Sequence, residues 1–235
     1  MDNLNKFFSG KRVFITGHTG FKGSWLTSVL IKLGSKVCGY SKIDEKKNQY
    51  IKLCYSRKIK NIYGDILNFK KLEKSLKNFK PDIIFHLAAQ ALVSKSYSNP
   101  YNTFQTNTVG TLNILDITRN LKNVKSLVII TSDKCYRNIE IKRGYNENDV
   151  LGGDDPYSAS KAAAEIIFNA YNKSFYYQRK KLGIATTRAG NVIGGGDWSK
   201  DRIIPDCIKS INKKNRLIIR NPNSTRPWQH VLEPV

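Results

Sequence analysis

Short apolar runs alternate with longer amphipathic stretches from the start of the chain to Arg188. The apolar runs are rich in β-branched and aromatic residues, which is typical of strands in a parallel sheet. They predict strands at Arg12–Thr16, Lys36–Tyr40, Ile59–Tyr63, Asp82–Leu87, Ser126–Thr131 and Ile184–Thr187. The amphipathic stretches predict helices at Ser24–Leu33, Asn68–Phe79, Tyr101–Arg119 and Pro156–Lys181. This order predicts an α/β fold, a Rossmann-like parallel sheet with helices on both faces.

Local signals mark where some of these helices begin and end. Asn68 has the short polar side chain that suits a helix N-cap, and Gly34 follows the first predicted helix as a stop signal. After Arg188 the pattern changes to a Gly-rich turn, one helix from Pro205 and a short strand at Arg216–Arg220. We therefore predict a first domain at 1–188 and a second, smaller and partial one at 189–235.

Composition adds a strong positive charge. The chain has 40 Lys and Arg against 18 Asp and Glu, a formal net charge of +22. The lysines are dispersed rather than packed into one arm, so we interpret them as a bias of the whole chain and expect no nucleic-acid partner. A basic surface would still steer a substrate that carries a pyrophosphate.

Targeting and metal-binding signals are weak. The N-terminal residues lack the apolar core of a signal peptide, and no apolar run approaches the roughly 20 residues of a membrane-spanning helix. We therefore expect a cytoplasmic protein with no membrane partner. The four cysteines are scattered, without a CxxC pair or a nearby histidine cluster, so we expect reduced thiols and no metal site.

The first predicted strand leads directly into a glycine-rich turn and then a helix. Gly17, Gly20 and Gly23 have the spacing GxxGxxG. Residues without a Cβ atom let backbone amides at a helix N-terminus approach a pyrophosphate. We predict that these glycines and Phe21 bind the phosphates of a dinucleotide.

The adenine end of this dinucleotide is less clear. An acidic residue about 20 positions further on would bind the ribose of NAD, but the second strand runs into Lys42, and the nearest acid is Asp44. Because Lys42 would suit a 2′-phosphate, the spacing leaves NAD and NADP open. Asp65 and Ile66 follow the third strand and are better placed to bind the adenine end, although Asp65 is also interpretable as a simple loop acid.

A candidate catalytic pair lies in the helix that begins near Pro156. Tyr157 and Lys161 are four residues apart and therefore share a helix face. A phenol has a pKa of about 10, and a nearby ammonium favours its ionised form. Ser132 and Asp133 end the preceding strand, and parallel sheets place active sites beyond such ends. The pattern predicts a tyrosine that acts as a general base.

Several longer motifs carry a resemblance to a known family. They read FFSGKRVFITGHTGFKGSWL, PDIIFHLAAQALV, TSDKCY, GGDDPYSASK, RAGNVIGGGDW and RPWQHVLEP, and they extend along nearly the whole chain. The sequence resembles the extended short-chain dehydrogenases/reductases and, among them, the CDP-glucose 4,6-dehydratases. The resemblance implies NAD as cofactor, a nucleotide sugar (CDP-glucose) as substrate, and a homodimer.

The resemblance also implies catalytic roles. Tyr157 would take the proton from the glucose 4-OH while hydride passes to NAD, and Lys161 would hold the nicotinamide ribose. Asp133 would serve as acid to the leaving 6-OH. Lys134 stands where related dTDP-glucose enzymes have a glutamate base for the C5 proton, so the Ser132-Asp133-Lys134 triplet is typical of the CDP-glucose enzymes. Hydride returns to C6, and the enzyme is a lyase.

Further residues take roles from the same resemblance. Leu87, Ala88 and Ala89 would flank the nicotinamide, and His86 is either a cofactor contact or a packed histidine. Asn107 would support the site through backbone hydrogen bonds. The residues that would line the sugar-nucleotide side are Asn191, Asp197, Trp198, Arg202, Arg226 and His230.

Other functions stay open. The chain ends inside a motif that family members continue, so we expect the sugar-binding pocket to be incomplete. One alternative is another nucleotide-sugar epimerase, dehydratase or reductase, although Asp133 and Lys134 argue against a simple epimerase. The other is an inactive truncated fragment that at most binds dinucleotide.

Overall fold

The computed structural model describes residues 2–42, 59–219 and 221–235. Asp44 and Cys54 lie outside these ranges. A six-stranded sheet forms the centre of the molecule, with all neighbouring strands parallel and the order β3-β2-β1-β4-β5-β6. The strands are β1 (Arg12–Thr16), β2 (Lys36–Ser41), β3 (Ile59–Tyr63), β4 (Ile83–His86), β5 (Ser126–Ile130) and β6 (Gly183–Thr187). All six predicted strands are therefore confirmed, with ends shifted by a residue or less.

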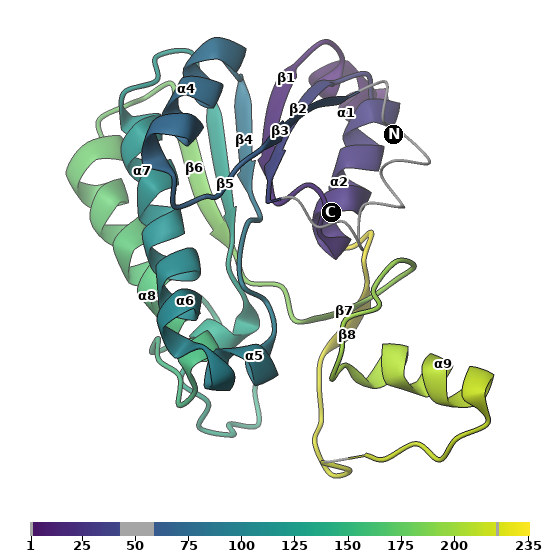
Figure 1. Cartoon of the computed structure of the whole chain (residues 1–235). Coiled ribbons are helices and arrows are strands. Elements are labelled where there is room, and N and C mark those ends of the chain that lie inside the picture. The colour runs from purple at the N-terminus through teal and green to yellow at the C-terminus, as the bar shows by residue number, and fades with distance from the viewer. Residues whose placement is uncertain (1, 43–58, 220) are drawn as a thin grey trace.

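Helices cover both faces of this sheet, as Figure 1 shows. On one face lie α4 (Phe69–Phe79), α7 (Gly110–Arg119) and α8 (Pro156–Tyr171), and α2 (Phe21–Lys32) lies on the other. Shorter helices are α1 (Asp2–Phe8), α5 (Val93–Ser98) and α6 (Pro100–Phe104). The arrangement confirms the predicted α/β Rossmann-like fold class.

The apolar core divides between the two faces because side chains alternate along each strand. Phe14 points into the larger core with Leu72 and Ile114, whereas its neighbour Val13 packs with Leu30 beneath α2. These side chains are at most 1% exposed. Complete burial of each contributes about 1.5–3 kcal/mol, so the core fixes the strands whose ends carry the site.

Two predicted helix ends, the Asn68 cap and the Gly34 stop, are confirmed. Asn68 Oδ1 accepts a hydrogen bond from Lys71 N at 3.0 Å and so caps α4. The first helix ends at the predicted position, since Gly34 has a positive φ of 81°. Its start was placed too late, because α2 begins at Phe21 rather than Ser24.

Two predicted helices are interrupted by wider, π-helical turns. The predicted helix at Tyr101–Arg119 is α6, a π-helical turn at Gln105–Val109 and then α7. The predicted helix at Pro156–Lys181 is α8 followed by a π-helical turn at Asn172–Tyr176. Such turns often occur at functional sites, and the first one contains Asn107.

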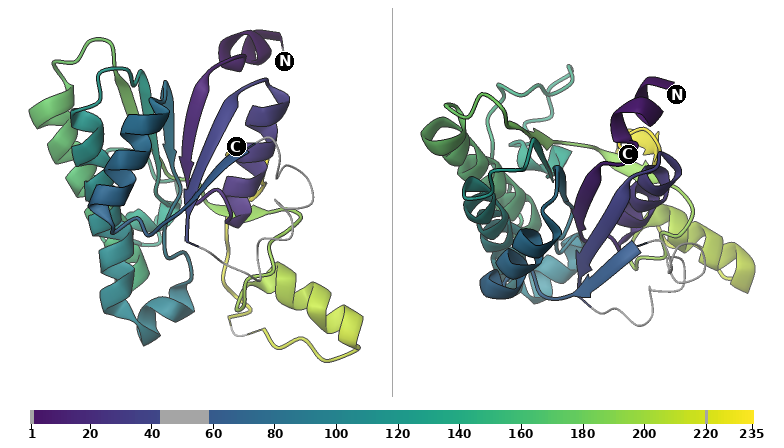
Figure 2. Two further views of the ribbon diagram at one scale, coloured as in Figure 1. Left: turned by 45° about the horizontal axis from the view of Figure 1, so that its top comes forward. Right: turned by 90° about the horizontal axis from the view of Figure 1, so that it is seen from above.

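The chain after Arg188 forms a small unit beside the carboxyl ends of the main strands. β7 (Asn191–Ile193) and β8 (Trp228–His230) pair in parallel, and α9 (Ile203–Lys213) lies between them in sequence. Figures 1 and 2 show α9 projecting away from the sheet. The helix from Pro205 is therefore confirmed.

The predicted strand at Arg216–Arg220 is wrong. Residues 215–219 are irregular, and Ile218 is 85% exposed. A strand needs a neighbour for its backbone groups, and β7 and β8 pair with each other instead.

Across the described ranges, no helix combines the length and apolarity that crossing a bilayer requires. In the same part of the chain, no three Cys, His, Asp or Glu side chains gather into a possible metal site.

Candidate active site

The glycine turn after β1 is shaped by close backbone packing. Gly17 has φ of 76°, and a Cβ atom there would lie 2.7 Å from Ala88 N. A Cβ atom on Gly23 would lie 2.2 Å from Gly17 O. Gly20 is the N-cap of α2 and supplies no side-chain cap, and no acidic residue lies in the first turn of the helix. The turn therefore leaves the positive end of the helix dipole available to an anion.

His18 fastens this turn to the neighbouring strands. Its ring is fully buried, and Ser41 Oγ lies 2.9 Å from Nδ1 while Asn61 Oδ1 lies 2.8 Å from Nε2. Because the Asn61 oxygen is an acceptor, Nε2 carries the proton and Nδ1 accepts from Ser41. Burial lowers the pKa of His18, so the ring is neutral at physiological pH.

A second neutral histidine joins β1 to β4. His86 is 3% exposed, with Nδ1 2.7 Å from Thr16 Oγ1 and Nε2 3.3 Å from Thr111 Oγ1. Thr16 Oγ1 also accepts hydrogen bonds from the backbone N–H groups of Leu87 and Ala88, both at 3.2 Å. Burial lowers the pKa of His86 to about 3. The ring is thus a packed strand-end histidine, and its bond to Thr16 orients the hydroxyl that accepts from residues 87 and 88.

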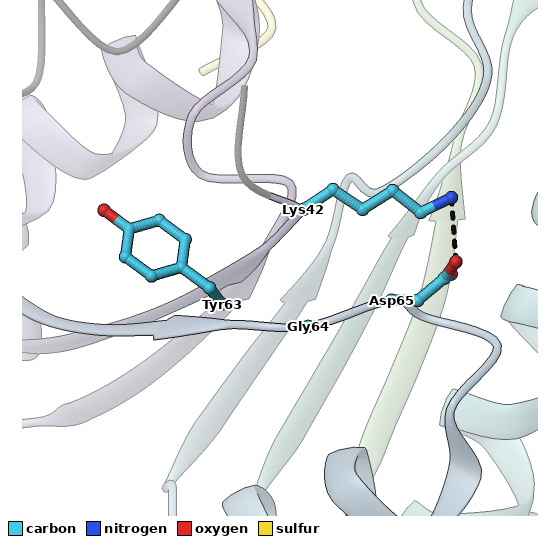
Figure 3. A pocket seen from close by; sticks show the side chains of 4 residues that line it. All are labelled: Lys42, Tyr63, Gly64 and Asp65. Carbon is cyan, nitrogen blue, oxygen red and sulfur yellow. Dashed lines mark ion pairs between the residues drawn. The ribbon is translucent and has the colours of Figure 1, made fainter. Parts of the chain in front are cut away.

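The predicted adenine end forms a small open pocket, drawn in Figure 3, lined by Lys42, Tyr63, Gly64 and Asp65. Lys42 Nζ lies 2.8 Å from Asp65 Oδ2. Burial raises the pKa of Asp65, yet the Leu67 N–H and the Lys42 ammonium together hold this pKa below its ordinary value. The neighbouring Ile66 side chain is 3% exposed and packs in the apolar core.

Tyr157 and Lys161 lie on the buried face of α8, which Asp155 caps by accepting hydrogen bonds from Tyr157 N and Ser158 N. Burial holds the pKa of Tyr157 above its ordinary value, and the charge of Asp133 adds to this rise; the Ser132 hydroxyl and the Arg202 guanidinium offset only part of it. Burial and the positive charge of Lys22 lower the pKa of Lys161 to about 8. Lys161 Nζ donates to Ile130 O at 3.2 Å, so both side chains reach the carboxyl end of β5.

The Ser132-Asp133-Lys134 triplet occupies a short 3-10 turn, Asp133–Cys135, directly after β5. Ser132 Oγ donates to Asp133 Oδ1 at 2.9 Å, and Lys134 Nζ lies 3.6 Å from the same oxygen. Lys134 Nζ also donates to Asn191 Oδ1 at 3.3 Å. The structure thus brings the triplet, the tyrosine and the first residue of β7 to one edge of the sheet.

The remaining predicted sugar-nucleotide residues divide into two groups. Arg202 Nη1 bonds Asp197 Oδ2 at 2.6 Å, and its charge acts on Tyr157 and Lys22. The other three are more exposed. Trp198 is 59% exposed, Arg226 donates to the carbonyl oxygen of its neighbour Thr225, and His230 packs edge-on against Trp25 at 5.9 Å.

Asn107 supports the site as the sequence suggested. Its Oδ1 accepts from Gln90 N at 2.8 Å, and its Nδ2 donates to Gln90 O at 3.0 Å and to Ser160 Oγ at 2.9 Å. These bonds tie the loop after Ala89, which is half-buried, to the helix that carries the tyrosine.

The structure also brings to this edge three residues for which the sequence motifs predict no role. Lys22, in the glycine turn, is partly buried, and burial and nearby Arg202 lower its pKa. Glu165 and Arg188 form a buried ion pair behind Lys161. Glu165 lies four residues after Lys161, so helical spacing was a signal available in the sequence.

Comparison with known proteins shows the family to which the chain belongs. Residues 14–235 match the family model described as GDP-mannose 4,6 dehydratase. The chain belongs to the GDP-mannose 4,6 dehydratase family. It is 49% identical to a CDP-glucose 4,6-dehydratase of Salmonella typhimurium over 97% of its length, and 32% identical to a dTDP-D-glucose 4,6-dehydratase of Dictyostelium discoideum over 98%. The predicted resemblance is therefore confirmed.

A solved structure supports the same family fold. The epimerase Mth375 of Methanothermobacter thermautotrophicus superposes with a TM-score of 0.86, at 26% identity, covering 99% of this chain and 68% of that one. The chain spans 65% of the length of the Salmonella protein and 55% of the Dictyostelium protein. Family membership is thus established for the matched part.

Proposed function

We propose that this chain carries out the NAD-dependent dehydration of CDP-D-glucose to CDP-4-dehydro-6-deoxy-D-glucose. The observation that carries the proposal is the placing of Asp133 and Lys134 beside Tyr157 and Lys161 at one edge of the sheet. A simple epimerase has no use for an acid and a base at C6 and C5. The 49% identity to a CDP-glucose 4,6-dehydratase supports the choice of substrate.

The residues of the glycine turn fit a dinucleotide. The close packing of Gly17 and Gly23 leaves no room for side chains, and the N-terminus of α2 is free of acidic groups. At the adenine end, Asp65 neutralises Lys42, which favours NAD over a cofactor with an added 2′-phosphate. When bound, NAD would take up a hydride from C4 and return it to C6.

The oxidation half needs a base for the 4-OH proton, which we assign to Tyr157. The Ser132 hydroxyl and Arg202 favour its ionised form, against the effect of burial. Lys161 lies one helical turn away, and its buried ammonium is positioned by Ile130 O to hold the nicotinamide ribose. We assign Gly17, Gly20, Phe21, Gly23 and residues 87–89 to the rest of the cofactor site.

The elimination half needs a base at C5 and an acid at C6. We assign the base to Lys134, which must be neutral when it accepts the C5 proton, and the acid to Asp133, which would protonate the leaving 6-OH. Asn191 holds the lysine nitrogen at 3.3 Å and so directs it toward the sugar side. Arg202 would bind the diphosphate of the substrate together with Arg226, since guanidinium groups match phosphate oxygens.

Incubation of the purified chain with CDP-glucose and NAD tests this proposal. We expect a 4-keto-6-deoxy product, seen by its alkali-induced absorbance, and a fall of about 10²–10⁴ in rate for Tyr157→Phe. Tyr177→Phe, at a tyrosine that is 83% exposed, is the matched control and should keep full activity. A C4 epimer as sole product would contradict the dehydratase assignment, and dinucleotide binding without turnover would support the fragment alternative.

The homodimer and the cytoplasmic location stay predictions. Exposed apolar side chains on α5, α6 and α8 are compatible with a helical interface, namely Tyr97, Tyr101, Phe104 and Ile166.

A further inference from the structure

A buried ion pair lies behind the proposed catalytic residues, and the chemistry above makes no use of it. Glu165 is 0% exposed, and its carboxylate bonds Arg188 Nη2 at 2.8 Å. The same carboxylate accepts hydrogen bonds from Thr131 Oγ1 at 2.5 Å and from Thr186 Oγ1 at 3.0 Å. A charge buried this completely is costly unless it is fully paired.

The bonds of this pair reach both ends of the segment that contains the catalytic triplet. Thr131, bonded by Glu165, immediately precedes Ser132. Tyr136 immediately follows Cys135, and its hydroxyl accepts from Arg188 Nη1 at 2.9 Å. The Arg188 guanidinium also lies over the Tyr136 ring, 4.9 Å from its centroid. The ion pair thus holds residues on either side of 132–135.

The same pair is tied to the tyrosine helix. Tyr157, Lys161 and Glu165 are spaced by four residues along α8 and share its buried face. Arg188 follows directly after β6, three residues before Asn191, whose side chain bonds Lys134. One buried contact therefore connects α8, the end of β5 and the chain that enters β7.

We propose that the Glu165–Arg188 pair is a positioning device that fixes segment 132–135, and with it Asp133 and Lys134, relative to Tyr157 and Lys161. The effect of this pair on catalysis rests on the proposed function, whereas its effect on the position of segment 132–135 does not. Loss of one partner leaves the other charge buried and unpaired, and releases the segment at one or both ends.

Two cysteines that are buried in the described part of the chain provide a test that needs no substrate. Cys135 lies inside the segment and Cys38 lies in β2, and each is 0% exposed. Burial raises the pKa of both thiols to about 12, and at Cys135 the negative charge of Glu165 adds to this rise. Alkylation at neutral pH therefore reports local opening most directly in Tyr136→Phe, which leaves Glu165 charged and should also speed the alkylation of Cys135. Peptide mass spectrometry after iodoacetamide treatment reads each cysteine separately.

We expect Glu165→Gln to speed the alkylation of Cys135 about tenfold or more while Cys38 stays unchanged. Glu73→Gln removes the same charge from an exposed ion pair with Lys77 on α4 and should change neither cysteine. Tyr136→Phe removes only the hydroxyl that accepts from Arg188, so it keeps the test usable if Glu165→Gln does not fold. An equal rise at both cysteines, or no rise at Cys135, would overturn the proposal.

A second measurement, of product and reduced cofactor, separates the oxidation at C4 from the elimination across C5 and C6. With CDP-glucose and NAD, Glu165→Gln should form the 4-keto-6-deoxy product about tenfold more slowly than the wild type. Reduced cofactor should accumulate to a higher level in the variant, because Tyr157 and Lys161 still support hydride transfer from C4 to NAD while the elimination is slowed. An equal fall in the rates of oxidation and elimination would show that the ion pair does not selectively position Asp133 and Lys134. If the wild-type chain makes no product, the proposed function fails, and the alkylation test still decides on the ion pair.

Discussion

The glycine turn after β1 and the Ser132–Cys135 segment after β5 lie at the same edge of the sheet, but different forces hold them. The turn is held by backbone contacts and by two neutral histidines, His18 and His86. The segment is held by ionised groups, with Glu165 and Arg188 behind it. We therefore expect close packing to determine whether the glycine turn, the cofactor side, keeps its conformation. We expect buried charges to determine how segment 132–135, the catalytic side, is aligned.

The largest effect should come from adding one carbon to the cofactor side. In Gly23→Ala the new Cβ atom would lie 2.2 Å from Gly17 O, a backbone atom that cannot rotate away. We expect the free energy of unfolding to fall by roughly 2–4 kcal/mol and NAD binding to be lost. Urea denaturation and calorimetric titration with NAD measure the two effects.

Gly144→Ala is the control for this substitution. A Cβ atom at Gly144 meets no atom within 4 Å, so its effect should stay below about 0.5 kcal/mol. Equal destabilisation by both variants would mean that close packing does not define the turn.

A smaller effect, dependent on pH, should mark the catalytic side. Burial and Lys22 lower the pKa of Lys161 from 10.5 to about 8. Between these values the unfolded chain binds a proton that the folded chain has released, so stability rises with pH in this window and the full cost of the buried charge remains below pH 8. Relative to Lys161→Met, the wild type should gain about 1–3 kcal/mol from pH 8 to 10.5.

Urea midpoints of both proteins at several pH values give this difference, in which titration of lysines that do not interact with Lys161 cancels. A difference that stays flat across the window would show that Lys161 titrates normally.

The smallest effect tests whether the histidine network is neutral. Thr111→Val removes the hydroxyl 3.3 Å from His86 Nε2 and should lower the free energy of unfolding by about 0.5–1.5 kcal/mol. Because the His86 pKa is about 3, the loss should be the same at pH 7 and pH 10. A loss of stability that differs between pH 7 and pH 10 would show that charge also contributes to the contacts around His86.

Many features of the fold and of the site could be predicted from the sequence because their signals are local. Strand periodicity, the Asn68 cap and the four-residue spacing of Tyr157 and Lys161 depend on neighbours along the chain, and each is confirmed. The Gly17–Gly23 turn also followed from its place between a strand and a helix.

The remainder depends on contacts between distant segments. The bond between Glu165 and Arg188 joins α8 to the residue after β6, and no spacing in the sequence shows that these two segments meet. The apolar residues at 217–219 fit the pattern of a strand, but they are irregular because β7 and β8 pair with each other. The wider turn at Gln105–Val109 serves the bonds of Asn107 to Gln90, a residue on another loop.

The hydrogen bond between Thr16 and His86 has a further consequence for chain connectivity. It joins residues 70 positions apart, whereas the bond from Thr131 to Glu165 spans 34. Each doubling of the length of a closed loop adds only about 0.6 kcal/mol of entropic cost, so the two bonds differ little in the entropy lost on loop closure. The order of synthesis matters more: a chain emerging from the ribosome cannot form the bond from Thr16 to His86 until β4 has been made, although every glycine of the turn beside Thr16 is translated before β4.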